Sequence, residues 1–529
     1  MGRLDGTSIA IIGGGVGGLA NACYLAKAGA DVTVLERNEQ LGGRLSRLYR
    51  DGFTFDMGPS WYLLPDVFDR FFGHFGYSTD DFYDLTHLDP HYGIYFMDGD
   101  YIEVPDDPDK ATGIFEYYEE GAGAAFQEYL ENSKHTYEAG MEHFVYTDRS
   151  RFRDWIDPSL PFKARGIDVR NTMQEHVEQY FDHPKLQQLM QYTLVFLGGS
   201  PTNTPALYNL MSHADFNLGV WYPDGGLGAV VDALVELGDE LGVDYHVNAE
   251  VTKIRGRRGA FVVDIERPAR DWETPISDAP DDLPTGIELP EDGPPNSSNH
   301  DDSYGELMTD LVVAGTDLAH VERDLLPSEK RAYGEDYWES RTYAPSAFML
   351  YLGVEGDVPE LDQHTLVLPL DWSDHFDSIF EDPAWPENPS YYLSVPSKTD
   401  ESVAPDGHNT IVALVPIAPG LEDDPETREK FRDKLLADLA EHTGTDIRDR
   451  IVVEESFCAS GFSGRYNSDK GTALGIAHTL MQTAMFRPNH RYPGVDGLYV
   501  TGATTNPGIG VPMCLISGEI TADKIINDI

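Results

Sequence analysis

The stretch IAIIGGGVGGLANACYLAKAGADVTVLER, residues 9–37, predicts an apolar strand that leads directly into a glycine-rich turn and a helix. The glycines fall at Gly13, Gly15 and Gly18, which is the spacing of a dinucleotide-binding turn. Gly13 permits the tight turn, Gly15 lets the backbone approach a pyrophosphate, and Gly18 lets the helix pack against the strand. The stretch therefore predicts a Rossmann-like α/β domain.

Glu36 follows the second strand of this stretch and favours the same interpretation. A carboxylate at that position accepts hydrogen bonds from both ribose hydroxyls of a dinucleotide, and it would repel a ribose 2′-phosphate. We count Glu36 and its neighbour Arg37 as cofactor-binding residues. An ordinary glycine-rich turn is the alternative, but strand, helix and Glu36 are all in register. The choice between NAD and FAD stays open on these residues alone.

The chain ends with a second glycine signature, GLYVTGATTNPGIGVPMCLISGEITADKII at residues 497–526. It predicts a strand over 497–501, a turn at Gly502, and a helix from Val511 that is preceded by Gly508 and Gly510. A helix N-terminus favours nearby anions, so this one could favour a reduced flavin. The same residues could also simply close the sheet, and both interpretations can hold together.

Five further segments resemble known flavoproteins. LGGR at 41–44 and FDMGPS at 55–60 look like the continuation found in the amine-oxidase and carotenoid-desaturase superfamily. The chain resembles the bacterial- and archaeal-type phytoene desaturases of the FAD-dependent, amine-oxidase-like superfamily over nearly its whole length, in segments 197–205 (LGGSPTNTP), 219–226 (GVWYPDGG) and 482–488 (QTAMFRP).

The resemblance implies FAD as cofactor and a lipophilic acyclic C40 carotenoid as substrate. The implied reaction is desaturation of phytoene toward lycopene by hydride transfer to flavin N5, with oxygen or a membrane quinone as electron acceptor. Arg44 would reach the phosphates or the ribityl chain, although a surface ion pair is its alternative. The resemblance assigns no catalytic acid or base, and the further cofactor-binding residues that it implies are Gly43, Arg44, Gly58, Pro59, Ser60, Val251, Gly502, Gly510 and Val511.

Three other functions compete with this one. The nearest is a carotenoid 3,4-desaturase or a carotenoid isomerase, which motifs separate poorly from a phytoene desaturase. A flavin amine oxidase is disfavoured by the middle segments, and a non-enzymatic prenyl-lipid-binding protein is disfavoured by Gly15, Glu36 and Arg44. The C-terminal signature also departs from the family, because Asn506 stands where many members have histidine. Asn506 cannot act as an acid or base at ordinary pH.

A chain of 529 residues predicts two or more domains. Helical and strand signals around 225–255 and a strand over 307–315 predict a return to the cofactor domain. We expect a discontinuous FAD-binding domain with an interleaved α+β substrate-binding domain. The FAD-binding domain would take residues 1–75, 225–325 and 485–529, and the substrate-binding domain residues 76–224 and 326–484.

The formal charge of −53 comes from 91 acidic and 38 basic residues. Such a chain repels nucleic acid, so we expect no nucleic-acid partner. Its self-repulsion is screened at molar salt, where the Debye length is about 3 Å. The composition therefore indicates a halophilic host, such as a halophilic archaeon.

Residues 268–304 are rich in proline, acidic and small polar residues, and predict a mobile surface loop.

No secretory signal or membrane-spanning segment is expected, which favours a cytoplasmic protein. We expect it to associate peripherally with a membrane, because its substrate is an oil. Segments 68–75 and 180–196 could dip into a membrane interface, or could be amphipathic core helices. No metal site is expected. Trp61, Tyr62 and Trp221 are candidates to stabilise a carbocation, with core packing as the alternative.

Overall fold

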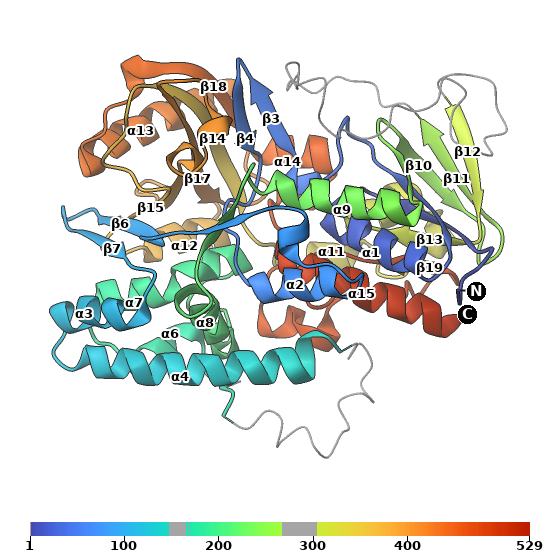
Figure 1. The fold of residues 1–529 in the computed structure, drawn as a ribbon, viewed down its shortest axis with the longest axis horizontal. Helices are drawn as coiled ribbons and strands as arrows, with labels where there is room; N and C mark the ends of the chain where they lie inside the picture. Colours follow the sequence, from blue (N-terminus) through green and yellow to red (C-terminus); the bar gives the residue numbers. More distant parts are fainter. Residues whose placement is uncertain (1, 148–165, 169, 267–303) are drawn as a thin grey trace.

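The computed structural model describes residues 2–147, 166–168, 170–266 and 304–529. Figure 1 shows a Rossmann-like part on the right, and a second sheet with a group of helices on the left. The predicted α/β class is confirmed. The predicted loop at 268–304 lies almost entirely outside the described residues, and its two flanking strands pair with Glu266 opposite Tyr304.

A five-stranded parallel sheet forms the centre of the Rossmann-like part. Its strand order is β19-β13-β1-β2-β9, with β1 between β13 and β2. Such strands read as continuous apolar runs because helices cover both faces of a parallel sheet. The bounds are β1 (Ser8–Ile12), β2 (Asp31–Leu35), β9 (Asp244–His246), β13 (Leu311–Ala314) and β19 (Leu498–Val500).

Helix α1 (Val16–Lys27) is buried on most sides because it packs between α9 (Gly228–Leu241) and α15 (Val511–Asp528). The two ends of the chain meet here. Arg3 donates to Asn527 at 3.5 Å, and a Cβ placed on Gly17 would lie 2.8 Å from the Gly502 Cα. Both terminal glycine signatures therefore belong to one structural unit, as Figure 1 shows beside the labels of the termini.

The single strand predicted over 307–315 is wrong, because the structure has two strands there. β12 (Tyr304–Thr309) joins a three-stranded antiparallel sheet, and β13 joins the parallel sheet. Asp310 separates them, since its carboxylate accepts hydrogen bonds from the backbone N–H and the hydroxyl of Ser8, both at 3.0 Å. The other two strands of the small sheet are β10 (Glu250–Arg255) and β11 (Phe261–Glu266).

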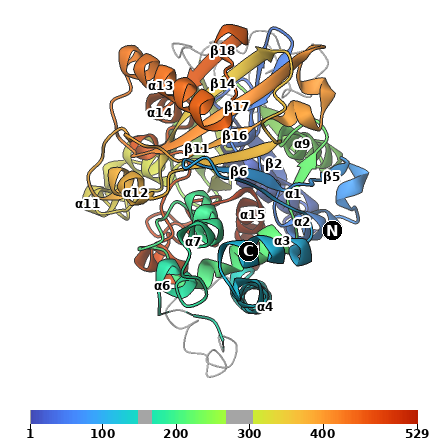
Figure 2. The same ribbon diagram turned by 90° about the vertical axis from the view of Figure 1, so that its left-hand side faces the viewer.

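A seven-stranded sheet, in the order β18-β14-β17-β16-β15-β6-β7, lies over the second part of the molecule (Figure 2). β6 and β7 form an antiparallel hairpin, and Gly99 takes a φ of +89° in its turn. The bounds are β6 (Tyr92–Phe96), β7 (Tyr101–Val104), β14 (Ser346–Glu355), β15 (His364–Leu368), β16 (Tyr391–Ser394), β17 (His408–Ile417) and β18 (Ile451–Phe457).

Helices from two chain segments complete the second part, and α3, α4, α6 and α7 gather below the sheet in Figure 2. These strands and helices come from the ranges predicted for the substrate-binding domain, and the division into two interleaved domains stays a prediction. The remaining bounds are α2 (Pro65–Gly73), α3 (Pro108–Tyr118), α4 (Ala122–Gly140), α6 (Met173–Val177), α7 (Pro184–Gln191), α8 (Leu210–Phe216), α10 (Leu318–His320), α11 (Glu335–Glu339), α12 (Ser373–Phe380), α13 (Pro425–Thr443), α14 (Ala459–Tyr466), β3 (Arg47–Arg50), β4 (Phe53–Asp56), β5 (Leu85–His87) and β8 (Trp221–Pro223).

The segments considered for membrane contact pack inside the protein. Phe68, Phe71 and Phe72 are buried against α1, and Phe181 and Leu189 are buried in the core of the helix group. The core alternative therefore holds for both segments. No helix among the described residues is long and apolar enough to cross a membrane.

Candidate cofactor site

A cavity opens where the two glycine signatures meet, and we call it the cofactor cavity. Three of the predicted cofactor-binding residues do not line it: Gly18 lies behind the turn, and Gly58 and Ser60 line a second cavity. The predicted residues that do line the cofactor cavity are Gly13, Gly15, Glu36, Arg37, Gly43, Arg44, Pro59, Val251, Gly502, Gly510 and Val511. The structure brings together eleven of fourteen residues that span almost the entire chain, so the two signatures build one site.

The three glycines of the first turn have different surroundings. Gly13 takes a φ of +99°, and a Cβ on Gly18 would lie 2.2 Å from the Gly13 carbonyl oxygen. Gly15 caps the N-terminus of α1 with an extended backbone, and its Cβ position has no atom within 4 Å. The open space at Gly15 therefore lies against backbone N–H groups that have no partner within the helix. This is the cradle that a pyrophosphate requires.

Glu36 is buried at the carboxyl end of β2. One of its carboxylate oxygens accepts from the Gly14 N–H at 2.7 Å, and the other accepts from the Asn38 N–H at 2.8 Å. Burial raises the pKa of Glu36 above its ordinary value, and these two hydrogen bonds oppose that rise. Each oxygen keeps a further lone pair for a hydroxyl donor. The site thus fits the ribose and pyrophosphate of a dinucleotide.

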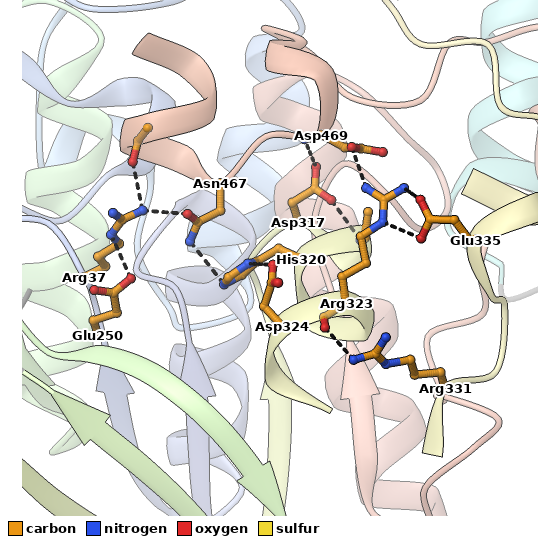
Figure 3. A network of polar contacts seen from close by, with 12 residues as sticks. Arg37, Glu250, Asp317, His320, Arg323, Asp324, Arg331, Glu335, Asn467 and Asp469 are labelled. Atoms are coloured by element: carbon orange, nitrogen blue, oxygen red, sulfur yellow. Dashed lines mark hydrogen bonds and ion pairs between the residues drawn. The ribbon is translucent and has the colours of Figure 1, made fainter. Parts of the chain in front are cut away.

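Arg37 and Arg44 both hold the segment that follows α14. Arg37 forms an ion pair with Glu250 at 3.1 Å and donates to Asn467 at 2.6 Å, as Figure 3 shows. Arg44 donates to the Ser468 hydroxyl at 2.7 Å, and its guanidinium lies 5.6 Å from the ring centre of Tyr466. Their role as direct cofactor ligands stays a prediction.

Residues 465–467 also line this cavity, although no sequence pattern predicted it. Asn467, in a left-handed conformation with φ +51°, donates to His320 at 3.2 Å, and His320 contacts Asp324 at 2.7 Å. Figure 3 also shows a separate group of contacts, in which Arg323 pairs with Glu335 and Asp469 at 2.6 Å each. The lining residues that sequence reasoning missed include Asp317, His320, Arg465, Tyr466 and Asn467.

A second, apolar cavity of about 730 Å³ adjoins the first. Among the described residues that line it, none is Asp, Glu or Lys, and Arg44 is the one charged side chain. This composition stands out in a chain with 91 acidic residues. The two cavities have a set of lining residues in common, which we call the shared wall: Arg44, Pro59, Tyr466, Leu474, Ile509, Gly510 and Val511.

Only Trp61 of the three candidate aromatic residues lines the apolar cavity, where it stacks on His364 with ring centres 4.5 Å apart. For the other two, the core-packing alternative holds. Tyr62 stacks on Phe68 in the core, and Trp221 donates to a backbone carbonyl at 2.8 Å without lining either cavity. Which of these aromatic side chains faces the cavity depends on packing against the seven-stranded sheet, and no local sequence pattern predicts it.

An imidazole does reach the C-terminal signature, but it comes from elsewhere in the sequence. His478 Nε2 accepts from the Ile509 N–H at 3.0 Å, and its Nδ1 contacts the Tyr208 hydroxyl. Burial lowers the pKa of His478 well below its ordinary value, so the ring is neutral. Since Nε2 accepts, the ring proton is on Nδ1. His478 therefore braces the loop before α15 and does not act as a base.

The described residues contain no group of three His, Cys, Asp or Glu side chains that could hold a metal ion. Cys514 lines the cofactor cavity on the first turn of α15. Burial raises the pKa of its thiol to about 11. The thiol is consequently protonated and inert at neutral pH, as expected for a small packing residue.

Several known proteins are similar to this chain in sequence or in fold. The family described as flavin containing amine oxidoreductase matches residues 16–273 and 288–526. The chain is 58% identical, over 100% of both chains, to the carotenoid 3,4-desaturase of Haloarcula japonica. It is 31% identical to the phytoene desaturase of Neurospora crassa, over 98% of this chain and 85% of the relative. An oxidoreductase structure from Methanosarcina mazei has the same fold, with a TM-score of 0.59 at 16% identity over 97% of this chain and 99% of that one.

Proposed function

The chain belongs to the flavin-containing amine oxidoreductases and, within them, to the carotenoid desaturases, and we propose that it desaturates the 3,4 bond of an acyclic C40 carotenoid. The observation that carries this proposal is the 58% identity to a carotenoid 3,4-desaturase over the full length of both chains. The sequence patterns favoured phytoene as substrate, and the comparisons favour the alternative instead.

The protein is an FAD-dependent oxidoreductase. The α1 N-terminus with Gly13 and Gly15 would hold the pyrophosphate, Glu36 the ribose, and the shared wall the ring system. When bound, FAD supplies the two-electron oxidant that takes a hydride from a carbon chain. The residues of the chain itself bind the substrate and shield the reacting atoms from water.

The residues of the apolar cavity exclude water and orient the substrate. Their apolar side chains keep a developing carbocation away from solvent, and the face of Trp61 can stabilise positive charge. No carboxylate among the described lining residues competes for that cation or receives its proton. An amine substrate would enter as an ammonium ion that needs a counter-charge, so the same composition disfavours an amine oxidase.

The rim of the apolar cavity supports peripheral membrane binding. Leu480, Met481 and Phe486 are 57%, 62% and 43% exposed, and Leu480 and Phe486 also line the cavity. Exposed apolar side chains in one short segment are unusual for a soluble surface. We place the membrane contact at residues 480–486, where a carotenoid would pass directly from the bilayer into the cavity. Reduced FAD would then return its electrons to oxygen or to a membrane quinone.

Product analysis tests the substrate assignment. The purified protein, in high KCl, is given liposomes that contain phytoene and lycopene together, and products are separated by chromatography. A 3,4-desaturase consumes lycopene and leaves phytoene. Preferential conversion of phytoene would contradict the proposal and support the phytoene desaturase reading, which the 31% identical relative favours. Geometric isomers of the same mass would instead indicate an isomerase.

A further inference from the structure

Arg487 is a buried cation that has no counter-ion among the described residues. Its side chain is 4% exposed, and no Asp or Glu among the described residues pairs with it. Its guanidinium donates to two backbone carbonyls, those of Ala503 at 3.3 Å and Ile476 at 2.9 Å, and its Nε has no partner. Burial lowers the pKa of Arg487 to about 10, so the group is still charged at neutral pH.

The guanidinium contacts residues that adjoin the shared wall, although it lines neither cavity itself. Ala503 lines the cofactor cavity, and a Cβ on Gly508 would lie 3.0 Å from Arg487 Nη2. Arg487 also acts electrostatically on Cys514, which lines the cofactor cavity, and on Tyr208, which lines the apolar cavity. Its charge is therefore felt on both sides of this wall.

A buried charge normally has a partner, because an unpaired one costs several kcal/mol. The neighbours of Arg487 do not supply a negative charge. His478 beside it is neutral, and burial raises the pKa of Tyr208 above its ordinary value, so its hydroxyl stays protonated. No described residue beside Arg487 supplies the counter-charge, and a negatively charged group that binds at the wall would supply it.

The reaction provides such a charge. A desaturation removes two hydrogens: one leaves with both electrons of its C–H bond as a hydride, and the neighbouring carbon loses a proton, which is released to water, so that the remaining electron pair forms the double bond. The hydride makes the uncharged ring system of the oxidised cofactor a monoanion. We propose that Arg487 is the standing counter-charge for this reduced, anionic flavin and raises its reduction potential. The proposal rests on the proposed function, since it requires FAD at the shared wall.

Arg487 would also brace the signature turn through its two carbonyl contacts, and the test must separate the two roles. Arg487→Gln keeps donors for the carbonyls and removes the charge. Arg341→Gln is the control, because Arg341 is a half-buried arginine that lines neither cavity and contacts Tyr337. The midpoint potential of bound FAD is measured by dye-coupled spectroscopic titration in high KCl.

We expect Arg487→Gln to lower the equilibrium constant for two-electron reduction by at least about tenfold, which corresponds to about 30 mV. Arg341→Gln should leave it unchanged. If Arg487→Gln binds FAD with the potential of the unaltered protein, Arg487 is a structural brace and the proposal is overturned.

A measurement on the unaltered protein covers the case in which the variant does not fold. Its fully reduced flavin should show the spectrum of the anion at a pH at which free reduced flavin is protonated. A neutral reduced spectrum would contradict the proposal even if the variants cannot be made. Failure of the proposed function looks different, because the unaltered protein would then bind no FAD or would bind FAD without desaturating carotenoids.

Discussion

A substitution at Gly15 distinguishes most clearly between an effect on folding and an effect on cofactor binding. Its extended backbone, with φ −74°, suits any residue, and its Cβ position has no atom within 4 Å. Gly15→Ala should therefore leave the fold intact and place a methyl group in the space reserved for the pyrophosphate. Gly18 is the matched control in the same turn, because its Cβ would overlap the Gly13 carbonyl oxygen at 2.2 Å.

The expected magnitudes differ for the two variants. For Gly15→Ala, a poorer helix cap and a less flexible unfolded chain oppose each other, so stability changes by at most about 1 kcal/mol. A pyrophosphate held away from one backbone N–H loses a charge-assisted hydrogen bond worth about 1.5–3 kcal/mol, which lowers affinity roughly 10- to 150-fold. Gly18→Ala should destabilise the protein itself by about 1–3 kcal/mol, because the helix must move away from the strand.

Two assays on FAD-free protein in high KCl decide the question. Urea unfolding gives the free energy of unfolding, and quenching of flavin fluorescence gives the dissociation constant for FAD. Gly15→Ala should unfold like the unaltered protein and bind FAD weakly, whereas Gly18→Ala should unfold earlier. FAD affinity that is unchanged in Gly15→Ala would refute the assignment of this cradle to the pyrophosphate.

Four further predictions concern other parts of the molecule. Asp215 is buried, accepts from the Tyr92 and Tyr192 hydroxyls at 2.9 Å each, and has its pKa raised to about 7 by burial. Because its folded pKa lies above the ordinary 3.8, the contribution of Asp215 to stability is largest at acidic pH and is lost as the pH rises toward 7. Asp215→Asn should remove up to about 4 kcal/mol of that loss, measured as the difference between the free energies of unfolding in urea at pH 4.5 and pH 8. The charge of −53 predicts that the melting temperature rises steeply between 0.1 and 2 M KCl, and an equal rise in sucrose alone would contradict electrostatic screening. Trp61→Leu should slow carotenoid turnover at least about tenfold while Trp221→Leu should not, because only Trp61 lines the apolar cavity; equal rates in steady-state assays would remove Trp61 from the mechanism. Replacing residues 268–302 by a short turn should leave flavin absorbance intact, since the flanking strands pair directly, and loss of flavin would show that the insertion contributes to the site.

The cofactor turn could be predicted from sequence because its determinants are local. Gly13, Gly15 and Gly18 act within one turn, and the position of Glu36 is set by the strand that directly precedes it. Residues 464–469 could not be predicted, because their contacts with Arg37 and Arg44 connect positions more than 400 apart in sequence. The break in the strand predicted over 307–315 could not be predicted either, because the hydrogen bonds between Asp310 and Ser8 also connect distant positions in the sequence.

Buried aromatic residues mark a second limit. Trp61, Tyr62 and Trp221 have the same apolar character in sequence, yet only Trp61 faces the apolar cavity. A core position and a cavity wall both exclude water, so composition cannot distinguish them. Arg487 belongs to the segment 482–488 that resembles the family. Only the structure shows that no described residue beside it supplies a counter-charge.

The central claim is that both ends of the chain hold one FAD beside a cavity for a carotenoid. Anaerobic mixing of the purified protein with lycopene in liposomes tests it most directly, with flavin and carotenoid absorption followed together. We predict that the oxidised-flavin band disappears as the carotenoid bands shift to longer wavelength, with one FAD reduced for each double bond formed. Carotenoid conversion while the flavin stays oxidised, or a purified protein that takes up no FAD, would contradict the account.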